Sequence, residues 1–322
     1  MRARPALTIF VTQSSNSGRQ LRLPDFIAVG PGRTGTTWLH EVLKGRVDLP
    51  AGIKETDFFT TNYHKGIEWY AHHFRDADGS RPIGEVNPYF GFPEAAERIA
   101  LHIPRCKIIC TFRNPVERIY SAYRLWRHYA LTNFPLDEFL VKVPQVIEVT
   151  RYAKHLPDWR ARFGQDRVLV LLNDDLRAGP QAYLDRVCDF IGIGRYPVPA
   201  LAAQGELINS ITDLPRFPRV ARKARRFMYW LEEKQAYATI NFLERAGLWK
   251  FSFGGGPKFS SLDQATEARL HDLMRPEFDA LEPMIGRDLS MWKEPRADRS
   301  PAAPRALAPF KGNSDPRWQG CR

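Results

Sequence analysis

The sequence is poor in cysteine and lacks any long apolar run, and both shortages limit the class of protein. Its 322 residues include four cysteines, whose spacing matches neither a zinc ribbon nor the paired framework of a small secreted domain. No stretch approaches the roughly 20 apolar residues of a membrane span. The apolar patch near the N-terminus, about six residues long, is short for a signal peptide. We therefore expect a cytoplasmic protein with reduced thiols and no stable membrane anchor.

Acidic residues are scarcer than basic ones. The chain has 36 Asp and Glu against 47 Lys and Arg, a formal net charge of +11. This excess favours an anionic partner, such as a nucleotide, a nucleic acid, an acidic glycan or a membrane surface, without choosing among them. For any single arginine, a solvated surface position is the simpler interpretation. The apolar content of 43% is ordinary for a folded chain, and the length suits one large α/β domain or two small ones.

Compact apolar runs alternate with helical patterns through the middle of the chain. The runs predict buried strands, and each is followed by a segment with helical signals. The pairs of predicted strand and following helix are 25–30 with 36–46, 107–112 with 114–130, and 167–172 with 179–193. Strands that alternate with helices are typical of βαβ units and a mainly parallel sheet, so we predict an α/β fold.

Composition divides the chain into three parts. Residues 1–22 predict a flexible leader, and residues 23–293 hold the alternating pattern of the folded domain. Residues 294–322 are rich in Pro, Ala and Arg without periodicity, which predicts a disordered tail. Within the domain, residues 216–250 predict a basic helical segment that could touch an anionic substrate, although a solvated helix face is the simpler interpretation.

The segment VGPGRTGTTWLHEVL (29–43) is similar to a nucleotide-binding loop with one substitution. A Walker loop needs Gly, four residues, Gly, Lys and then Ser or Thr. Gly30 and Gly35 have that spacing, but Thr36 stands at the lysine position. A Gly-rich turn between a strand and a helix still forms an anion site, because backbone N–H groups and the helix dipole point toward the ligand. An ordinary strand–helix turn is the alternative interpretation.

We expect three features of this loop to serve an anion. The glycines let the main chain approach the ligand, an arginine adds a fixed positive charge, and three hydroxyls add donors. The glycines are Gly30, Gly32 and Gly35, and the side chains are those of Arg33, Thr34, Thr36 and Thr37.

Five further segments follow the loop. They are GIKETDFF (52–59), YHKGIEWYAHHF (63–74), GEVNPYF (84–90), CTFRNPVERIYSAY (110–123) and GGGPKFSSLD…GRDLSMW (254–292). With the loop, they resemble the sulfotransferases that use 3′-phosphoadenosine 5′-phosphosulfate (PAPS), in particular the carbohydrate sulfotransferases of the heparan sulfate type. The resemblance covers about residues 25–292. It implies the sulfotransferase fold, a P-loop-like parallel β-sheet flanked by helices on both faces. It also implies PAPS as cofactor, adenosine 3′,5′-bisphosphate as product, and no metal.

The resemblance also implies roles for individual residues. Glu55 is expected to be the general base that removes the proton of an acceptor hydroxyl, and Glu85 is the second candidate. Arg33 and Lys54 are expected to neutralise the leaving phosphate oxygen during in-line transfer. The remaining implied cofactor-binding residues are Arg113, Ser121, Gly256 and Lys258, and the implied acceptor-binding residues are Glu85, Asn87, Tyr89 and Trp69.

Some of these roles also have a physical argument of their own. Arg113 ends a predicted strand, and a parallel sheet presents ligands beyond the carboxyl ends of its strands. Ser121 lies two helical turns further on, close enough to share one phosphate with Arg113. Lys258 follows three glycines, so we expect it on a mobile loop, which either closes over a nucleotide or merely connects two elements.

The chain departs from the family pattern at two positions. Arg33 stands where the family usually has lysine. Arginine keeps the charge but cannot serve as a proton donor, so Lys54 becomes the candidate for that role. Asn87 replaces a serine, and we expect this change to alter the acceptor contacts.

Two other functions stay open at this point. A divergent P-loop kinase or NTPase would need a metal-binding aspartate after an apolar strand, and VLLNDD (170–175) is the candidate for that strand. A non-enzymatic binder of anionic polymers would use the net charge alone. For the sulfotransferase we expect a hydroxylated acceptor, a glycan or a small molecule, and no nucleic acid. The identity of the acceptor and the oligomeric state cannot be read from the sequence.

Overall fold

The computed structural model describes residues 21–200 and 255–293 without a break. Between these ranges it describes residues 202, 211, 213–234, 236, 239–240, 242–243, 246–247 and 253. The leader predicted for residues 1–22, except its last two residues, and the tail predicted for 294–322 lie outside the described residues.

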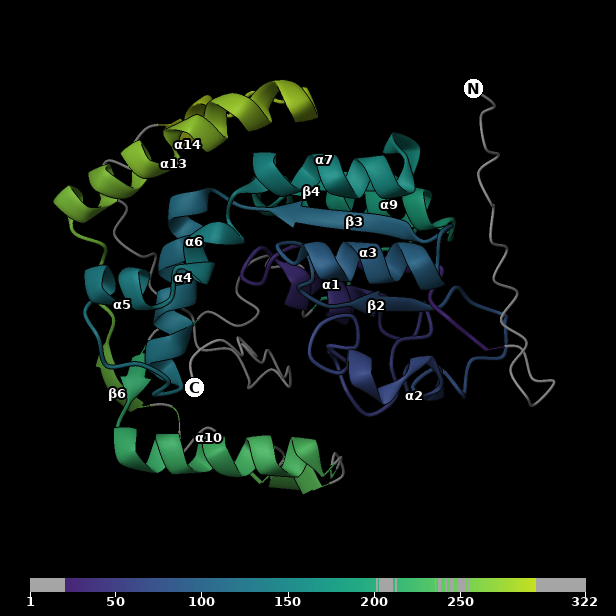
Figure 1. The fold of residues 1–322 in the computed structure, drawn as a ribbon, viewed down its shortest axis with the longest axis horizontal. Helices are drawn as coiled ribbons and strands as arrows, with labels where there is room; N and C mark the ends of the chain where they lie inside the picture. Colours follow the sequence, from purple (N-terminus) through teal and green to yellow (C-terminus); the bar gives the residue numbers. More distant parts are fainter. Residues whose placement is uncertain are drawn as a thin grey trace, which may run out of the picture.

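The centre of the molecule is a four-stranded parallel sheet with the order β2-β1-β3-β4. Figure 1 shows β2, β3 and β4 of this sheet among the flanking helices. The strands are β1 Phe26–Ala28, β2 Gly84–Val86, β3 Lys107–Phe112 and β4 Val168–Leu172. Three of the four were predicted from the sequence. The missed strand, β2, has the sequence GEV with a glutamate at its centre, so no apolar run marks it. From β1 the chain builds β2 on one side and β3 on the other, so the strand order reverses between β1 and β3.

Helices connect these strands and extend the fold beyond them. The helices predicted at 36–46, 114–130 and 179–193 are confirmed as α1, α4 and α9, each one to three residues shorter at its ends. The helices are α1 Thr36–Leu43, α2 Ile67–His72, α3 Pro93–His102, α4 Pro115–His128, α5 Leu136–Lys142, α6 Gln145–Glu148, α7 Tyr152–Phe163, α8 Asn173–Ala178, α9 Pro180–Ile191, α10 Pro218–Glu233, α13 Gln264–Ile285 and α14 Ser290–Lys293. Short 3₁₀ turns occupy Tyr63–Lys65 and Gln165–Arg167.

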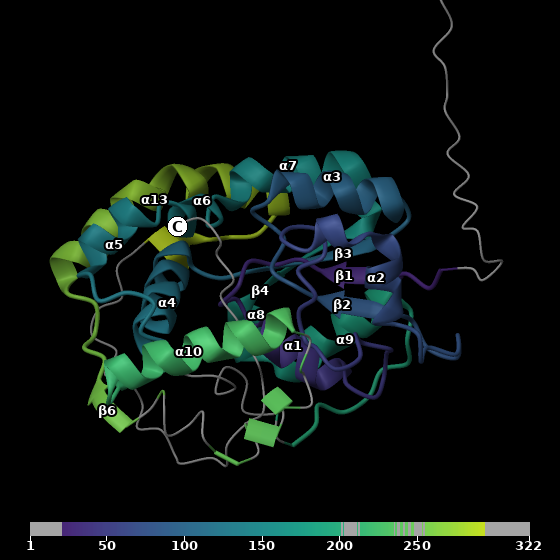
Figure 2. The ribbon, with the colours of Figure 1, turned by 60° about the horizontal axis from the view of Figure 1, so that its bottom comes forward.

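The two faces of the sheet belong to two separate hydrophobic cores. Ile27 and Ile108 point into a core that includes residues of α3, α4, α7 and α13. Their neighbours Phe26 and Ile109 point into the other core, with residues of α1 and α9. This alternation follows from the period of two in a strand. Figure 2 shows α3 and α7 on one side of the sheet and α1 and α9 on the other. The α/β fold with helices on both faces is therefore confirmed.

A smaller antiparallel ribbon lies beside α4. It consists of β5 Asp213–Pro215 and β6 Gly255–Lys258. The prediction of a mobile loop at Lys258 is wrong, because this residue pairs with Asp213 in the ribbon. The glycine at position 256 serves the same pairing, since a Cβ there would lie 2.5 Å from the carbonyl oxygen of Leu214.

The basic segment predicted as helical at 216–250 includes α10, which packs on a small satellite cluster of apolar side chains at the end of α4. The buried members of this cluster are Ala130, Ala221, Met228, Leu231, Ile240 and Phe253. None of the helices that the structure describes combines the length and the apolar character needed to cross a bilayer.

Candidate active site

The Gly-rich loop leaves the carboxyl end of β1 at the point where the strand order reverses, and α1 begins at Thr36 directly after it. Open parallel sheets bind ligands at this position. Gly30 is required by packing, because a Cβ on it would lie 2.0 Å from Thr111 Oγ1 of β3. Its part in the approach of an anion stays a prediction.

The side chain of Thr34 is placed differently from the prediction that its hydroxyl donates to an anion. Its hydroxyl donates to the carbonyl oxygen of Pro31 at 2.6 Å and lies 2.6 Å from Thr111 Oγ1, and the residue is fully buried. The side chain fastens the loop to β3 and does not face a ligand. Thr36 and Thr37 form the first turn of α1, where N–H groups have no partner within the helix.

A buried arginine that the sequence analysis missed holds the loop from the other side. Arg118 donates from Nε to the carbonyl oxygen of Gly32 at 3.1 Å. Its Nη1 donates to the carbonyl oxygen of Val146 at 2.7 Å and to Thr150 Oγ1 at 2.8 Å. Burial lowers the pKa of Arg118 to about 10. The signal for Arg118 in the sequence was its position, five residues after Arg113 on the helix that faces the loop.

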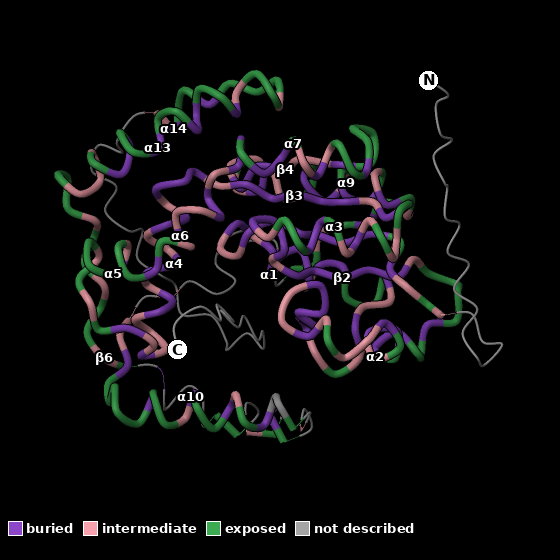
Figure 3. The backbone as a smooth tube through the Cα atoms, viewed as in Figure 1, coloured by how far each residue is buried: buried purple, intermediate pink, exposed green. Residues whose placement is uncertain are grey.

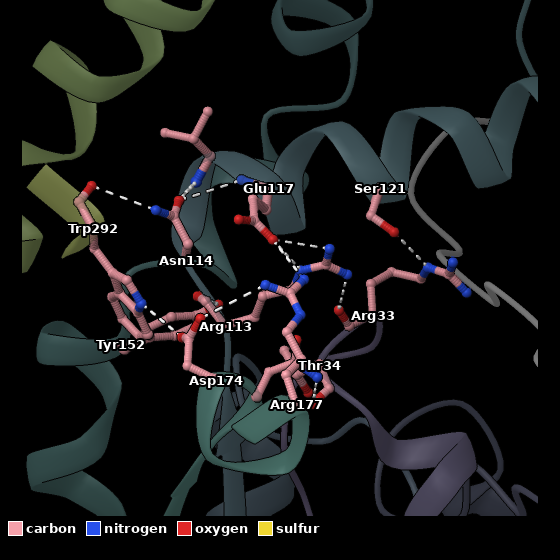
Figure 4. A network of polar contacts seen from close by, with 12 residues as sticks. Arg33, Thr34, Arg113, Asn114, Glu117, Ser121, Tyr152, Asp174, Arg177 and Trp292 are labelled. Atoms are coloured by element: carbon pink, nitrogen blue, oxygen red, sulfur yellow. Dashed lines mark hydrogen bonds and ion pairs between the residues drawn. The ribbon is translucent and has the colours of Figure 1, made fainter. Parts of the chain in front are cut away.

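Arg33 links the loop to α4. Its Nε donates to Ser121 Oγ at 3.0 Å (Figure 4). Its backbone has a φ of 77°, a region that non-glycine residues seldom adopt, so the loop is bent sharply at this side chain. Burial, followed by the nearby charge of Arg113, lowers the pKa of Arg33 to about 10. The side chain stays charged at neutral pH, but at a cost that a bound anion would relieve.

Arg113 lies directly after β3 and is held from several directions. Its Nε donates to Glu117 Oε2 at 3.0 Å, and its Nη1 approaches the carbonyl oxygen of Arg33 at 3.5 Å. Tyr152 donates its hydroxyl to the carbonyl oxygen of Arg113 at 3.0 Å. Arg33 thus contacts both Arg113 and Ser121, from two loops and a helix, and the sharing of one phosphate by Arg113 and Ser121 stays a prediction.

Two acidic residues, Glu117 and Asp174, extend the contacts of Arg113 to the C-terminal part of the fold. Glu117 Oε2 also accepts from Arg177 Nη2 at 2.9 Å, and Arg177 lies 3.6 Å from Asp174 Oδ1. Asp174 Oδ2 accepts from Trp292 Nε1 at 2.8 Å (Figure 4). Asn114, between Arg113 and α4, caps that helix by accepting from Val116 N at 2.9 Å. These bonds tie α14 to the end of the sheet.

The kinase alternative gains no support from this region. Asp174 contacts Trp292 and Arg177, and Asp175 forms ion pairs with Arg186 and Arg287. Both aspartates of VLLNDD are thus engaged with protein groups rather than presented at the loop. Within the described part of the chain, no group of three or more His, Cys, Asp or Glu side chains is arranged to hold a metal ion.

Lys54 and Glu55 form a buried pair near α1. Lys54 Nζ lies 2.9 Å from Glu55 Oε1 and donates to Thr37 Oγ1 at 3.2 Å. The two residues are 8% and 6% exposed. Lys54 therefore stands between the candidate base and the first turn of α1, where a phosphate-bearing ligand would have its negative charge.

Glu85 is fully buried, and both of its carboxylate oxygens accept hydrogen bonds. Oε1 accepts from the hydroxyl of Thr56 at 2.6 Å, the backbone N–H of Thr56 at 3.2 Å and Asn87 Nδ2 at 3.1 Å. Oε2 accepts from the hydroxyl of Tyr70 at 2.7 Å. Burial raises the pKa of Glu85.

The structure therefore corrects the roles expected for three residues. Glu85, Asn87 and Tyr89 are at most 1% exposed and bond one another, so direct contact with an acceptor is closed to them in this structure. Glu85 is likewise displaced as an alternative base. Because Thr56 follows Glu55 in the chain, the network instead holds the backbone on which Glu55 stands.

The remaining predicted residues lie further from the loop. Trp69 is half-buried beside Phe58, with Lys65 Nζ 4.5 Å from its ring centroid, and its contact with an acceptor stays a prediction. Lys258 is exposed on β6. The contact of this segment with α4 is made by its next residues: Tyr120 donates its hydroxyl to the carbonyl oxygen of Ser260 at 2.5 Å.

Arg124 is a second basic residue that the sequence analysis missed. It is half-buried one turn after Ser121 on α4, with its guanidinium 5.2 Å from the ring centroid of Phe259. Burial lowers the pKa of Arg124, and the charge of Arg113 lowers it further. Arg124 follows Ser121 by three residues, a spacing that places both side chains on one face of the helix. This spacing could have indicated Arg124 from the sequence.

Comparison with known proteins assigns the class. A family model described as the sulfotransferase domain matches residues 23–211, more than half of the chain. The chain therefore belongs to the sulfotransferase family.

Two relatives show where the likeness lies. The bifunctional heparan sulfate N-deacetylase/N-sulfotransferase 1 of Caenorhabditis briggsae is 26% identical over 262 residues, which cover 71% of this chain and 30% of that protein. The corresponding protein 4 of Mus musculus is 32% identical over 195 residues, which cover 53% and 22%. The chain spans less than a third of the length of these relatives.

A solved structure supports the same fold. The crystal structure of a sulfotransferase from Alicyclobacillus acidocaldarius matches with a TM-score of 0.62 at 20% identity. The match covers 85% of this chain and 100% of that one.

Proposed function

We propose that this protein transfers a sulfuryl group from PAPS to a hydroxyl of a carbohydrate, a glycosylated metabolite or another small acceptor. The observation that carries the proposal is the convergence of Arg33, Arg113 and Ser121 on the start of α1, at the reversal of the strand order. The family match and the sulfotransferase names of the relatives support it.

The residues present fit a ligand with two anionic ends. Burial and then the nearby charge of Arg113 lower the pKa of Arg33, and a bound anion would offset both effects. The turn of Gly32, Gly35, Thr36 and Thr37 would hold the 5′-phosphosulfate at the start of α1. Arg113 and Ser121 would hold the 3′-phosphate, with Arg33 between the two ends and Arg124 within reach of the second. Gly256 and Lys258 stay predicted cofactor contacts.

PAPS supplies an activated sulfuryl group and leaves as adenosine 3′,5′-bisphosphate. Glu55 is assigned as the base that takes the proton of the acceptor hydroxyl. Its Oε1 is engaged by Lys54 at 2.9 Å, so Oε2 is the atom assigned to the acceptor. The Glu85 network keeps the backbone of Glu55 in place through Thr56.

Lys54 and Arg33 are assigned to the charge that develops on the leaving oxygen. Lys54 already contacts Thr37 of α1, so its ammonium lies next to the turn that would bind the phosphosulfate. Arg33 is assigned to charge stabilisation alone, because its delocalised guanidinium is a poor proton donor and its Nε already donates to Ser121 Oγ. Any proton that the leaving oxygen needs is assigned to Lys54.

The first experiment is the transfer of labelled sulfate from PAPS to a panel of acceptors, together with calorimetric binding of adenosine 3′,5′-bisphosphate. We expect binding of this nucleotide in preference to AMP and ATP at fixed salt, and transfer to a hydroxylated sugar. No transfer to any acceptor together with no preference for the 3′-phosphate would refute the proposal. The panel includes amino sugars, because the relatives are named N-sulfotransferases.

The other two functions predict different results. A kinase or NTPase would hydrolyse ATP with magnesium. A binder of anionic polymers would lose affinity for every polyanion steeply as salt rises and would not distinguish the 3′-phosphate. The cytoplasmic location expected from the sequence stays a prediction.

A further inference from the structure

One side of α10 carries three basic residues and a tryptophan in a continuous row. Arg219, Lys223, Arg226 and Trp230 follow one another at helical spacing, and all four are exposed. Arg222 extends the row on one side. At about 1.5 Å per residue, the 16 residues of α10 offer a surface roughly 24 Å long.

Exposed apolar and aromatic side chains of the same helix flank or continue this row. Val220, Phe227 and Trp230 are 45%, 47% and 50% exposed. The rings of Phe227 and Trp230 stack, with centroids 5.8 Å apart and planes 15° apart. Scattered apolar residues are common on protein surfaces, but a contiguous group that includes a tryptophan marks an interaction surface.

The opposite side of α10 is the one that packs against the protein. Ala221, Met228 and Leu231 are buried in the satellite cluster at the end of α4. Figure 3 shows α10 at the margin of the molecule, exposed over most of its length with short buried stretches between. The helix therefore satisfies its contact with the fold through one face. The aromatic and basic face, made of Arg219, Val220, Arg222, Lys223, Arg226, Phe227 and Trp230, is not among the buried side chains of that cluster.

We propose that this aromatic and basic face of α10 binds the surface of an anionic lipid membrane. Lys and Arg are attracted to acidic headgroups, while Trp and Phe insert at the boundary between headgroups and acyl chains. The net charge of +11 is complementary to such a surface. The binding is peripheral, because α10 lies along the surface rather than across it.

The apolar side chains decide between a membrane and a dissolved polyanion. A nucleic acid or a sulfated glycan would be held by the arginines and the lysine, and its hydrated chain would leave Val220 in water. A membrane surface takes up both components of the face at once. The inference does not depend on the proposed function, since these residues lie outside the candidate active site.

The test measures co-sedimentation of the full chain with vesicles of phosphatidylcholine alone or mixed with phosphatidylglycerol. We expect binding to the mixed vesicles only, weaker at high salt. The double variant Phe227→Ala/Trp230→Ala should bind at least about tenfold more weakly, and Arg219→Glu/Lys223→Glu should abolish binding. Leu101→Ala and Arg275→Glu change exposed residues of α3 and α13 and should bind as the wild type does.

A second readout locates the inserted side chain. Lipids with brominated acyl chains quench tryptophan fluorescence on contact, and the quenching should be smaller in Trp230→Phe than in the wild type. Unchanged thermal unfolding and nucleotide binding establish that each variant is folded. Equal binding to neutral vesicles would overturn the proposal. So would full vesicle binding by the aromatic double variant, or heparin and DNA binding that depends on the basic residues with no binding to vesicles.

Discussion

Arg33 Nε donates to Ser121 Oγ at 3.0 Å, although the two residues are 88 positions apart in the chain. The bond joins the loop after β1 to the helix after β3, which are the two segments on either side of the strand-order reversal. If one nucleotide anion binds here, the two residues should act on it as a unit rather than independently.

A double-mutant cycle tests this coupling. We expect Arg33→Ala and Ser121→Ala each to weaken the binding of adenosine 3′,5′-bisphosphate by roughly 1.5–3 kcal/mol, the range for hydrogen bonds to charged groups. The double variant should lose less than the sum, because the first change already removes the shared contact. Calorimetric titration measures all four proteins. Strict additivity would contradict a shared anion, and exposed Ser80→Ala is the matched control.

Glu55→Gln should separate chemistry from binding. The amide cannot accept the acceptor's proton, so kcat should fall by about 10²–10⁴-fold. The affinity for adenosine 3′,5′-bisphosphate should stay unchanged, because Glu55 reaches the first turn of α1 only through Lys54. The measurement is single-turnover transfer with labelled PAPS beside a binding titration. Full turnover by Glu55→Gln would show that another group is the base.

Much of this site could be predicted because its residues follow strands in local motifs. Hydrophobic period predicts the strand at 107–112 and the helix after it, which places Arg113 at a strand end and Ser121 two turns further on. The roles of the two residues were implied by the family resemblance. The inward turn of Thr34 could not be predicted, because it depends on Thr111, 77 residues away. The same holds for the burial of Glu85, which depends on the pairing of a three-residue strand. The ribbon that holds Lys258 likewise depends on a distant partner, Asp213.

Glu85→Gln should affect stability first and activity second. Glutamine keeps one accepting oxygen where Glu85 has two. Its amide group therefore either reverses the Tyr70 hydroxyl bond or faces the fixed donors Thr56 N and Asn87 Nδ2. We expect the free energy of unfolding to fall by about 1–3 kcal/mol. Transfer should decline through the displaced Glu55 while nucleotide affinity is kept. A loss of kcat with wild-type stability would instead support Glu85 as the base, and denaturant titration with kinetics distinguishes the two.

The stability of the fold should decrease as the solution becomes mildly acidic. Burial lowers the pKa of six of the eight histidines, His40, His73, His102, His128, His155 and His271. A lowered pKa means that the unfolded chain binds more protons than the folded one below pH about 6.5. The free energy of unfolding therefore has its full value above this pH and decreases as the pH is lowered further. Each histidine that stays neutral contributes at most about 1.4 kcal/mol per pH unit.

Denaturant titrations between pH 8 and pH 5.5 measure this slope. Burial raises the pKa values of Glu85 and Glu277, so these two groups stabilise the fold as the pH falls toward the usual range of a glutamate. The decrease in stability should therefore be steepest close to pH 6. Replacing the buried His271 by Gln should flatten the slope, because a group that cannot be protonated no longer favours the unfolded chain in acid. The exposed His64→Gln should leave it unchanged. A free energy of unfolding that is constant or rises toward pH 5.5 would contradict the neutral state of these histidines.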